Sequence, residues 1–151
     1  MNRDPERNGV LATCEELGIG FVPWGPLGMG YLTGKLGADT RLDPKTDFRA
    51  GFDRFSPENL AANGPVVDLL ARVAARLGAT PAQIALAWLL ARRSWIVPIP
   101  GTRREEHLEE NLGAVHVVLT PADMQEIEGD LEKIAVHGGR MSQKYMVEVE
   151  Q

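Results

Sequence analysis

The stretch IGFVPWGPLGMGYLTGKL, residues 19–36, joins a short apolar segment to a run of closely spaced glycines. Residues 19–23 are apolar without alternation, which is typical of a parallel strand that is covered on both faces. Glycines directly after a strand let the backbone turn sharply and come close to a ligand. We therefore expect a buried strand here, followed by a binding loop that ends near Lys35.

A second stretch has the same organisation. Residues 95–99, WIVPI, form another short apolar segment, and PGTRREEHLEEN follows at residues 100–111. In parallel α/β folds, ligands bind beyond the C-terminal ends of the strands, where helix N-termini attract phosphate groups. Neither loop has the glycine spacing of a Rossmann fingerprint or of a Walker A loop. The expected ligand is still an anion.

Arg103 and Arg104 support the anion site. Cations in the first turn of a helix face the positive end of its dipole, which costs about 0.3–1 kcal/mol each, and a bound anion would reverse that sign. The alternative is that the two glutamates that follow offset both charges on a solvated surface.

Helix signals fill most of the remaining chain. Capping residues stand directly before prolines at Asp4, Ser56, Thr80 and Thr120. Two pairs have capping-box spacing, Thr80 with Gln83 and Thr102 with Glu105. Helical apolar periodicity follows these caps, so the order is helix, strand, long loop, two helices, strand and two helices. This order predicts a parallel α/β fold, and two strands are too few for so many helices. We therefore expect part of a larger architecture.

Length and composition restrict the class of protein. The chain has 151 residues, a formal charge of -5 and one cysteine, Cys14. We expect one domain, 1–151, without a disulfide or a zinc cluster and without general affinity for nucleic acids. Residues 37–55 are a long loop, and residues 136–151 form a tail. The absence of a long apolar run or a signal-peptide pattern leads us to expect a cytoplasmic protein that does not bind membranes.

Four motifs together resemble the C-terminal half of an aldo-keto reductase. They are GIGFVPWGPLGMGYLTGKL, FSPENLAAN, TPAQIALAWLLAR and IVPIPGTRREEHLEENLGA, and the likeness extends from about Arg3 to Glu128. The resemblance implies an α/β fold, the C-terminal part of a (β/α)8 TIM barrel, incomplete in this chain. We expect two parallel strands and about five to six helices. It also implies NADPH (the cofactor NADP) and a small aldehyde or ketone that is reduced by hydride transfer.

The same resemblance assigns a set of cofactor-binding residues. Trp24 corresponds to the aromatic ring that stacks on nicotinamide, although by position alone it is a core tryptophan. The pyrophosphate is assigned to Gly25, Pro26, Leu27 and Gly28, with Lys35 as their cationic partner. Arg49 lies in the loop 37–55, which is expected to cover the cofactor. The 2′-phosphate is assigned to Gly101, Thr102 and Arg103, and the phosphate region and adenine to His107, Glu110 and Asn111.

No catalytic residue is assigned. The family's tyrosine, lysine, aspartate and histidine belong to the half of the barrel that precedes this region. The tyrosines of this chain, Tyr31 and Tyr145, lie in no matching motif, and His116 and His137 have no catalytic or metal-ligand spacing. We expect the chain alone to be inactive. Two alternatives are a non-catalytic nucleotide-binding or regulatory module, and a half-barrel that pairs through exposed strand edges with a complementary half or another copy.

Overall fold

The structure, a computed structural model, describes residues 2–141. The helices are α1 (Asp4–Arg7), α2 (Val10–Leu17), α3 (Pro57–Ala62), α4 (Gly64–Leu77), α5 (Pro81–Arg92), α6 (Glu105–Leu112) and α7 (Pro121–Lys133). Four 3-10 turns are η1 (Tyr31–Thr33), η2 (Phe48–Gly51), η3 (Asp53–Phe55) and η4 (Gly113–His116). The described part thus has more α-helices than the expected five to six, in part because α1 and α2 are separate.

The two predicted strands lie side by side but do not form a sheet. Isolated parallel bridges join Phe21 to Ile96 and Trp24 to Ile99. The supporting hydrogen bonds run from the Val97 amide to the Phe21 carbonyl (2.9 Å) and from the Ile99 amide to the Pro23 carbonyl (3.3 Å). The predicted parallel direction is confirmed, whereas the prediction of strands is not: within residues 2–141 the pairing stays at single bridges. The physical reason is that each segment has one neighbour and contains a proline, which has no N–H to donate.

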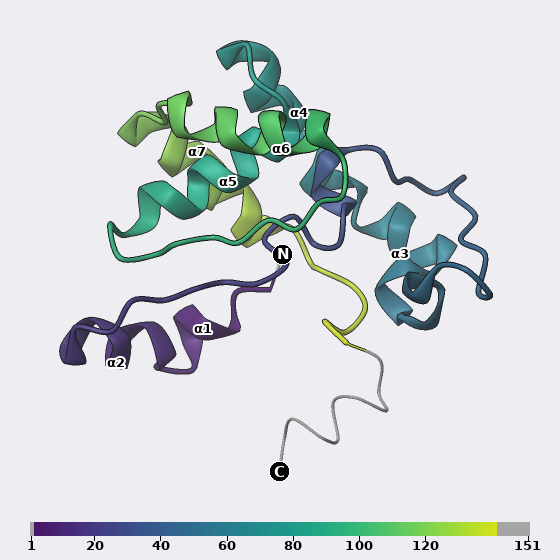
Figure 1. Ribbon diagram of the computed structural model, residues 1–151, viewed down its shortest axis with the longest axis horizontal. Coiled ribbons are helices and arrows are strands. Elements are labelled where there is room, and N and C mark those ends of the chain that lie inside the picture. Colours follow the sequence, from purple (N-terminus) through teal and green to yellow (C-terminus); the bar gives the residue numbers. More distant parts are fainter. Residues whose placement is uncertain (1, 142–151) are drawn as a thin grey trace.

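The core lies among α4, α5, α7 and the glycine-rich loop. Figure 1 shows these helices on one side of the paired segments and α1 and α2 on the other. Leu69, Val73, Ile84 and Ile127 are fully buried where α4, α5 and α7 meet. Tyr31 brings the glycine-rich loop into this core, because its hydroxyl donates to the Leu60 carbonyl at 2.8 Å. The loop is thereby fixed to the helices.

The predicted caps are confirmed at three of the expected places. Ser56 accepts a hydrogen bond from the Asn59 amide, and Thr80 and Thr120 form complete capping boxes with Gln83 and Asp123. The prediction for Asp4 is wrong by one residue, because α1 begins at Asp4 itself after Arg3.

The predicted capping box of Thr102 and Glu105 is also wrong. Thr102 Oγ1 accepts the Arg104 amide at 3.1 Å, a local turn that competes with helix capping. Helix α6 therefore starts only at Glu105, with Arg104 as its N-cap. Arg103 and Arg104 precede the first turn instead of belonging to it.

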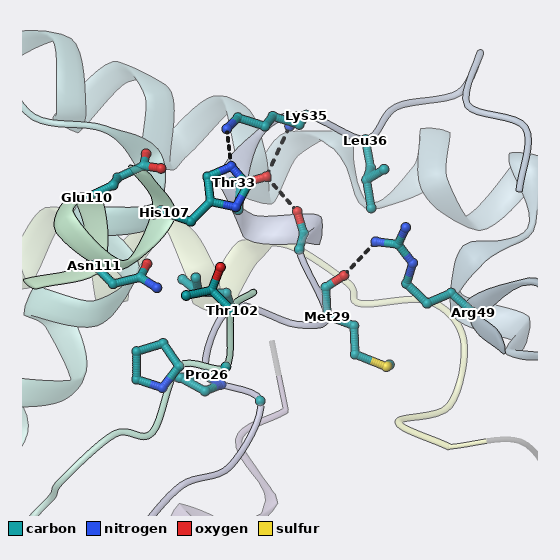
Figure 2. A pocket seen from close by; sticks show the side chains of 16 residues that line it. Pro26, Met29, Thr33, Lys35, Leu36, Arg49, Thr102, His107, Glu110 and Asn111 are labelled. Carbon is teal, nitrogen blue, oxygen red and sulfur yellow. Dashed lines mark hydrogen bonds between the residues drawn. The ribbon is translucent and has the colours of Figure 1, made fainter. Parts of the chain in front are cut away.

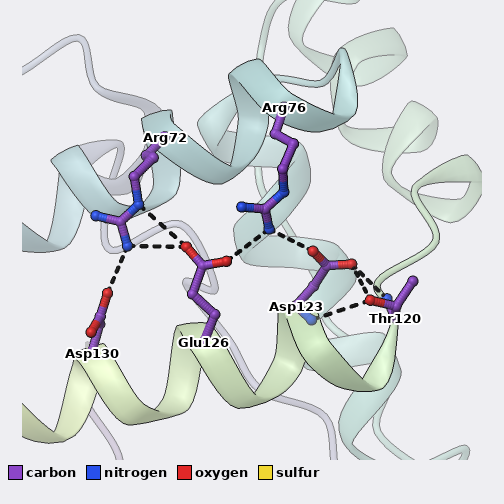
Figure 3. Close-up of polar contacts among 6 residues, drawn as sticks. All are labelled: Arg72, Arg76, Thr120, Asp123, Glu126 and Asp130. Carbon is purple, nitrogen blue, oxygen red and sulfur yellow. Dashed lines mark hydrogen bonds and ion pairs between the residues drawn. The ribbon is translucent and has the colours of Figure 1, made fainter.

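Ion pairs attach α7 to α4 (Figure 3). Arg72 lies 3.2 Å from Glu126 and 2.6 Å from Asp130, and Arg76 lies 2.5 Å from Asp123 and 2.9 Å from Glu126. Hydrogen bonds lower the pKa values of all three carboxyl groups. They come chiefly from Thr120 and then Arg76 at Asp123, from Arg76 at Glu126, and from Lys133 and then Arg72 at Asp130. The ion pairs of Arg72 and Arg76 fix the position of α7 along α4 over two helical turns.

Apolar side chains of the paired segments are exposed on one face. The bridges place Val22 beside Val97 and Trp24 beside Ile99, and all four side chains are exposed.

In residues 2–141 no single helix is long and apolar enough to cross a membrane. Helices α4 and α5 reach the length and composition only together, and they meet at 90°.

The predicted tail begins within the described residues. Asn63, which is fully buried, exchanges two hydrogen bonds with the backbone of His137, at 3.0 and 2.8 Å. The backbone of His137 is thereby attached to Asn63, at the junction of α3 and α4. Residues 142–151 of the tail lie outside the described part.

Candidate functional site

A cleft of about 330 Å³ separates the glycine-rich loop from the start of α6 (Figure 2). It is lined by segments that are far apart in the sequence. Of the residues predicted to bind the cofactor, the lining includes Gly25, Pro26, Leu27, Lys35, Arg49, Gly101, Thr102, His107, Glu110 and Asn111. The structure therefore brings most of the predicted set together, and leaves Trp24, Gly28 and Arg103 outside the lining.

The glycine-rich loop turns through left-handed backbone. Gly28 has a φ of 59° and Gly30 a φ of 92°, and the Met29 φ between them is 55°. This conformation costs a residue with a side chain about 1–2 kcal/mol, so Met29 is held there by its surroundings. Its carbonyl accepts a hydrogen bond from Arg49 Nη1 at 2.9 Å. The turns make the loop backbone itself a wall of the cleft.

Arg49 links the long loop to this wall. Its guanidinium forms a forked pair with the carboxylate of Asp47, with Nε–Oδ1 at 2.9 Å and Nη2–Oδ2 at 2.6 Å. The hydrogen bonds of Arg49 lower the pKa of Asp47, and those of Asp47 raise the pKa of Arg49. Gly30 lies beside this guanidinium: a Cβ there would be in ordinary contact with Nη1, at 3.4 Å, so the φ of 92° and not the space favours glycine. Arg49 thus lines the cleft, and its charge is partly balanced by Asp47.

Lys35 and His107 meet at the opposite rim. Lys35 Nζ lies 3.2 Å from His107 Nε2, so the lysine donates when the imidazole is neutral with its proton on Nδ1. Figure 2 shows this contact between the end of the glycine-rich loop and α6. The two rims supply three nitrogen-bearing side chains to one opening, with Arg49 the third. Such an opening suits an anionic ligand.

The segment before α6 carries further polar groups. Arg104 pairs with Glu106 at 3.0 Å on the exposed surface. The charge of this arginine is thus offset by a glutamate, which is the alternative to an anion site. Arg103 is exposed and directly follows Thr102, which lines the cleft. The carboxylate of Glu110 and the amide of Asn111 lie further along α6, and Asn111 is buried.

Trp24 stands apart from the cleft. Its side chain is 64% exposed, so it lies outside the core of the described residues. Its backbone is bridged to Ile99, so it lies where the first paired segment ends and the glycine-rich loop begins.

Several lining residues were missed in the sequence. They are Met29, Gly30, Thr33, Leu36, Ala82 and Pro100. Met29, Gly30 and Thr33 lie within the predicted loop, and Pro100 adjoins Gly101, so their position was a usable signal. Ala82 was not predictable, because it belongs to the core helix α5 and reaches the cleft only through tertiary packing.

The described residues contain little else of catalytic type. Tyr31 is buried in the core, which raises its pKa, and its hydroxyl is bonded to Leu60. Within residues 2–141, no group of three or more His, Cys, Asp or Glu side chains is placed to hold a metal ion. Tyr145 lies outside the described residues.

Comparison with known proteins identifies the family. The profile of the Aldo/keto reductase family matches residues 1–132. The chain therefore belongs to the aldo/keto reductase family, which is a family of oxidoreductases. This is the family that the motifs of the two loops indicate.

The relatives are longer than this chain. One relative is the Schizosaccharomyces pombe aldo-keto reductase yakc, whose name includes NADP(+). The two sequences are 40% identical over 132 residues, and this aligned region covers 87% of this chain and 38% of the relative. It is also 40% identical over 138 residues to a probable aldo-keto reductase of Glycine max, which covers 91% and 39%. A solved thermostable aldo-keto reductase with the inhibitor epalrestat matches at 31% identity and a TM-score of 0.59, over 85% of this chain and 36% of that one. These matches support the fold as part of a barrel.

Proposed function

We propose that this chain is the NADPH-binding part of an aldo/keto reductase-type oxidoreductase that reduces aldehydes or ketones. The observation that carries this proposal is the cleft, which is lined by Lys35 of the glycine-rich loop, Arg49 of the long loop and His107 of α6. The NADP(+) in the name of the yeast relative supports the choice of nucleotide. We place the protein in the cytoplasm.

Each part of the cofactor has a proposed place. Residues 25–28 hold the pyrophosphate, and Lys35 balances its charge. The backbone donors are the amides of Gly25 and Leu27, because Pro26 has no N–H and the Gly28 amide donates to the Gly25 carbonyl at 2.9 Å. Thr102 and Arg103 hold the 2′-phosphate, while Glu110 and Asn111 face the adenosine. Trp24 offers its exposed ring to the nicotinamide, which supplies the hydride when NADPH is bound.

Titration with NADPH and NADH tests the binding. We expect Lys35→Ala and Arg103→Ala each to weaken NADPH binding by about tenfold, the size of one charge-assisted hydrogen bond. Arg103→Ala should leave NADH unaffected, because NADH lacks the 2′-phosphate. Arg7→Ala is the control, since Arg7 is exposed in α1 and outside the cleft. A folded chain that binds neither nucleotide at millimolar concentration would refute the proposal.

Catalysis is proposed to require residues beyond this chain. With NADPH and a panel of aldehydes and ketones, we expect cofactor binding without oxidation of NADPH. That outcome is also the one that a non-catalytic nucleotide-binding or regulatory module would give. Measurable turnover by the chain alone would contradict the proposed division of the site.

The second candidate is a half-barrel that assembles with a partner. The exposed side chains of Val22, Trp24, Val97 and Ile99 favour it, because paired segments without further neighbours leave apolar surface and hydrogen-bonding edges open. The partner would be a complementary half-barrel or a second copy of this chain.

A further inference from the structure

Gln83 connects the core of the molecule to the helix that lines the cleft. It is the third residue of α5, and its side-chain oxygen accepts the Thr80 amide at 3.0 Å as part of the capping box. The other end of the same amide group, Nε2, donates to the Glu110 carbonyl of α6 at 3.0 Å. One side chain therefore caps α5 and holds α6.

Helix α6 has few other attachments to the core. Its leucines, Leu108 and Leu112, are exposed, and Asn111 is its only buried residue. Apolar packing therefore contributes little to the position of α6, and directional polar contacts have to set it. The Lys35–His107 contact at the rim lies between exposed or half-buried groups, so the half-buried bond from Gln83 is the better defined of the two.

The chain leaves room for this bond at Gly113. A Cβ on Gly113 would lie 2.5 Å from Gln83 Nε2, closer than any real contact allows. The backbone of Gly113 has a φ of -58° and a ψ of -19°, which any residue can adopt. A side chain at this position would therefore displace the Gln83 amide, whereas the backbone itself accepts any residue.

From this geometry we infer that Gln83 is a positioning residue for the adenosine end of the nucleotide. By fixing the carbonyl of Glu110, it sets where the side chains of Glu110 and Asn111 stand in the cleft, although Gln83 does not line the cleft itself. The inference rests on the proposed function. It predicts that disturbing Gln83 weakens binding of the adenosine half of NADPH and spares the nicotinamide half.

Two variants test this contact from opposite sides. Gln83→Glu keeps the capping box, because glutamate is a usual residue at this position, but replaces the Nε2 donor by an oxygen. Gly113→Ala keeps Gln83 and displaces its amide. The matched controls are Gln125→Glu, at an exposed position of α7, and Gly129→Ala, where an added Cβ meets nothing within 4 Å.

The probes are adenosine 2′,5′-bisphosphate and reduced nicotinamide mononucleotide, titrated by calorimetry. We expect Gln83→Glu and Gly113→Ala each to raise the dissociation constant of the bisphosphate by about five- to tenfold, the effect of one hydrogen bond, and to leave that of the mononucleotide within about twofold. The double variant should be no weaker than the stronger single one, because both changes break one contact. Amide hydrogen exchange should become faster in α6 and stay unchanged in α5.

Distinct results overturn the inference and the proposed function. Unchanged bisphosphate binding in a folded Gly113→Ala chain, or equal weakening of both probes, would overturn the role of Gln83. Should Gln83→Glu fail to fold, Gly113→Ala alone decides. A wild-type chain that binds neither probe nor NADPH would overturn the proposed function, and the inference with it.

Discussion

At the scale of single residues, Arg49 fastens one loop to another. Three of its N–H groups are used within the protein, two on Asp47 and one on the Met29 carbonyl. Its guanidinium also lies 5.9 Å from the ring centre of Phe55. Since Arg49 lowers the pKa of Asp47, the carboxylate stays ionised at neutral pH. The ion pair of Arg49 and Asp47 is lost only when the pH falls through that lowered pKa.

Asp47→Asn tests whether this ion pair holds the loop. The change removes the charge that orients Arg49, so the loop 37–55 should leave the glycine-rich loop more often. We expect faster trypsin cleavage after Arg41 and Lys45, by about fivefold for the loss of roughly 1 kcal/mol. Asp39→Asn is the control, because this exposed carboxylate makes no hydrogen bond or ion pair in the described residues. Equal cleavage rates of the two variants would show that Asp47 does not hold the loop.

Tyr31 fixes the same glycine-rich loop from the core side. Tyr31→Phe leaves the buried Leu60 carbonyl without its donor, so we expect the free energy of unfolding to fall by about 1 kcal/mol. Urea denaturation measures this value. An unchanged midpoint would mean that another donor replaces the hydroxyl.

Local chemistry decided which residue roles were predictable. The roles of Ser56, Thr80 and Thr120 follow from a cap and proline within a few residues, and the structure has them. Thr102 shares only the capping-box spacing and is followed by Arg103 instead of a proline, and its hydroxyl accepts the Arg104 amide. The competing turn is as local as the cap, so spacing alone does not separate them. Ala82 reaches the cleft through packing, which has no signature in the sequence.

At the scale of elements, the start of α7 is tied to pH. Asp123 accepts hydrogen bonds from the hydroxyl and the backbone amide of Thr120, which lower its pKa before Arg76 adds to the effect. A carboxyl group whose pKa is lowered on folding stabilises the protein above its unfolded pKa. This contribution is lost as the pH falls through the folded pKa of Asp123.

Thr120→Ala should therefore destabilise the protein in a pH-dependent way. We expect a loss of about 1 kcal/mol in the free energy of unfolding at pH 7, the usual value of a helix cap. The difference from wild type should shrink as the pH falls below about 4, where Asp123 becomes protonated in the unfolded chain and then in the folded one. Urea denaturation across this range measures it. Thr80→Ala is the control, since its partner Gln83 does not titrate, and an equal pH dependence in both variants would exclude Asp123 as the cause.

The paired segments show how far an element can be predicted. Apolar residues at 19–23 and 95–99 predicted two buried parallel strands, and the parallel bridges follow that direction. Strand formation itself depends on how many neighbours supply hydrogen bonds, which is a property of the whole sheet. With one neighbour each, and with Pro23 and Pro98 in the pairing, the segments remain bridged and largely exposed.

At the scale of the whole molecule, apolar surface is open on separate elements. Val22, Val97 and Ile99 are exposed on the paired segments, and Leu108 and Leu112 on α6. The relatives are more than twice as long as the part of them that this chain matches, at 38% and 39% of their lengths. We expect these faces to bind other polypeptide, since burying one valine or leucine side chain contributes about 1.5–3 kcal/mol.

Self-association is the direct test of this expectation. If a second copy covers the paired segments, the wild-type mass measured by light scattering after size-exclusion chromatography should rise with concentration. Val97→Asp should shift the chain toward monomer, because burying a carboxylate in an apolar interface is strongly unfavourable. Val118→Asp, at an exposed valine outside the paired segments, should leave association unchanged. A wild-type monomer at all concentrations would contradict pairing with a second copy, whereas equal loss in both variants would move the interface away from the paired segments.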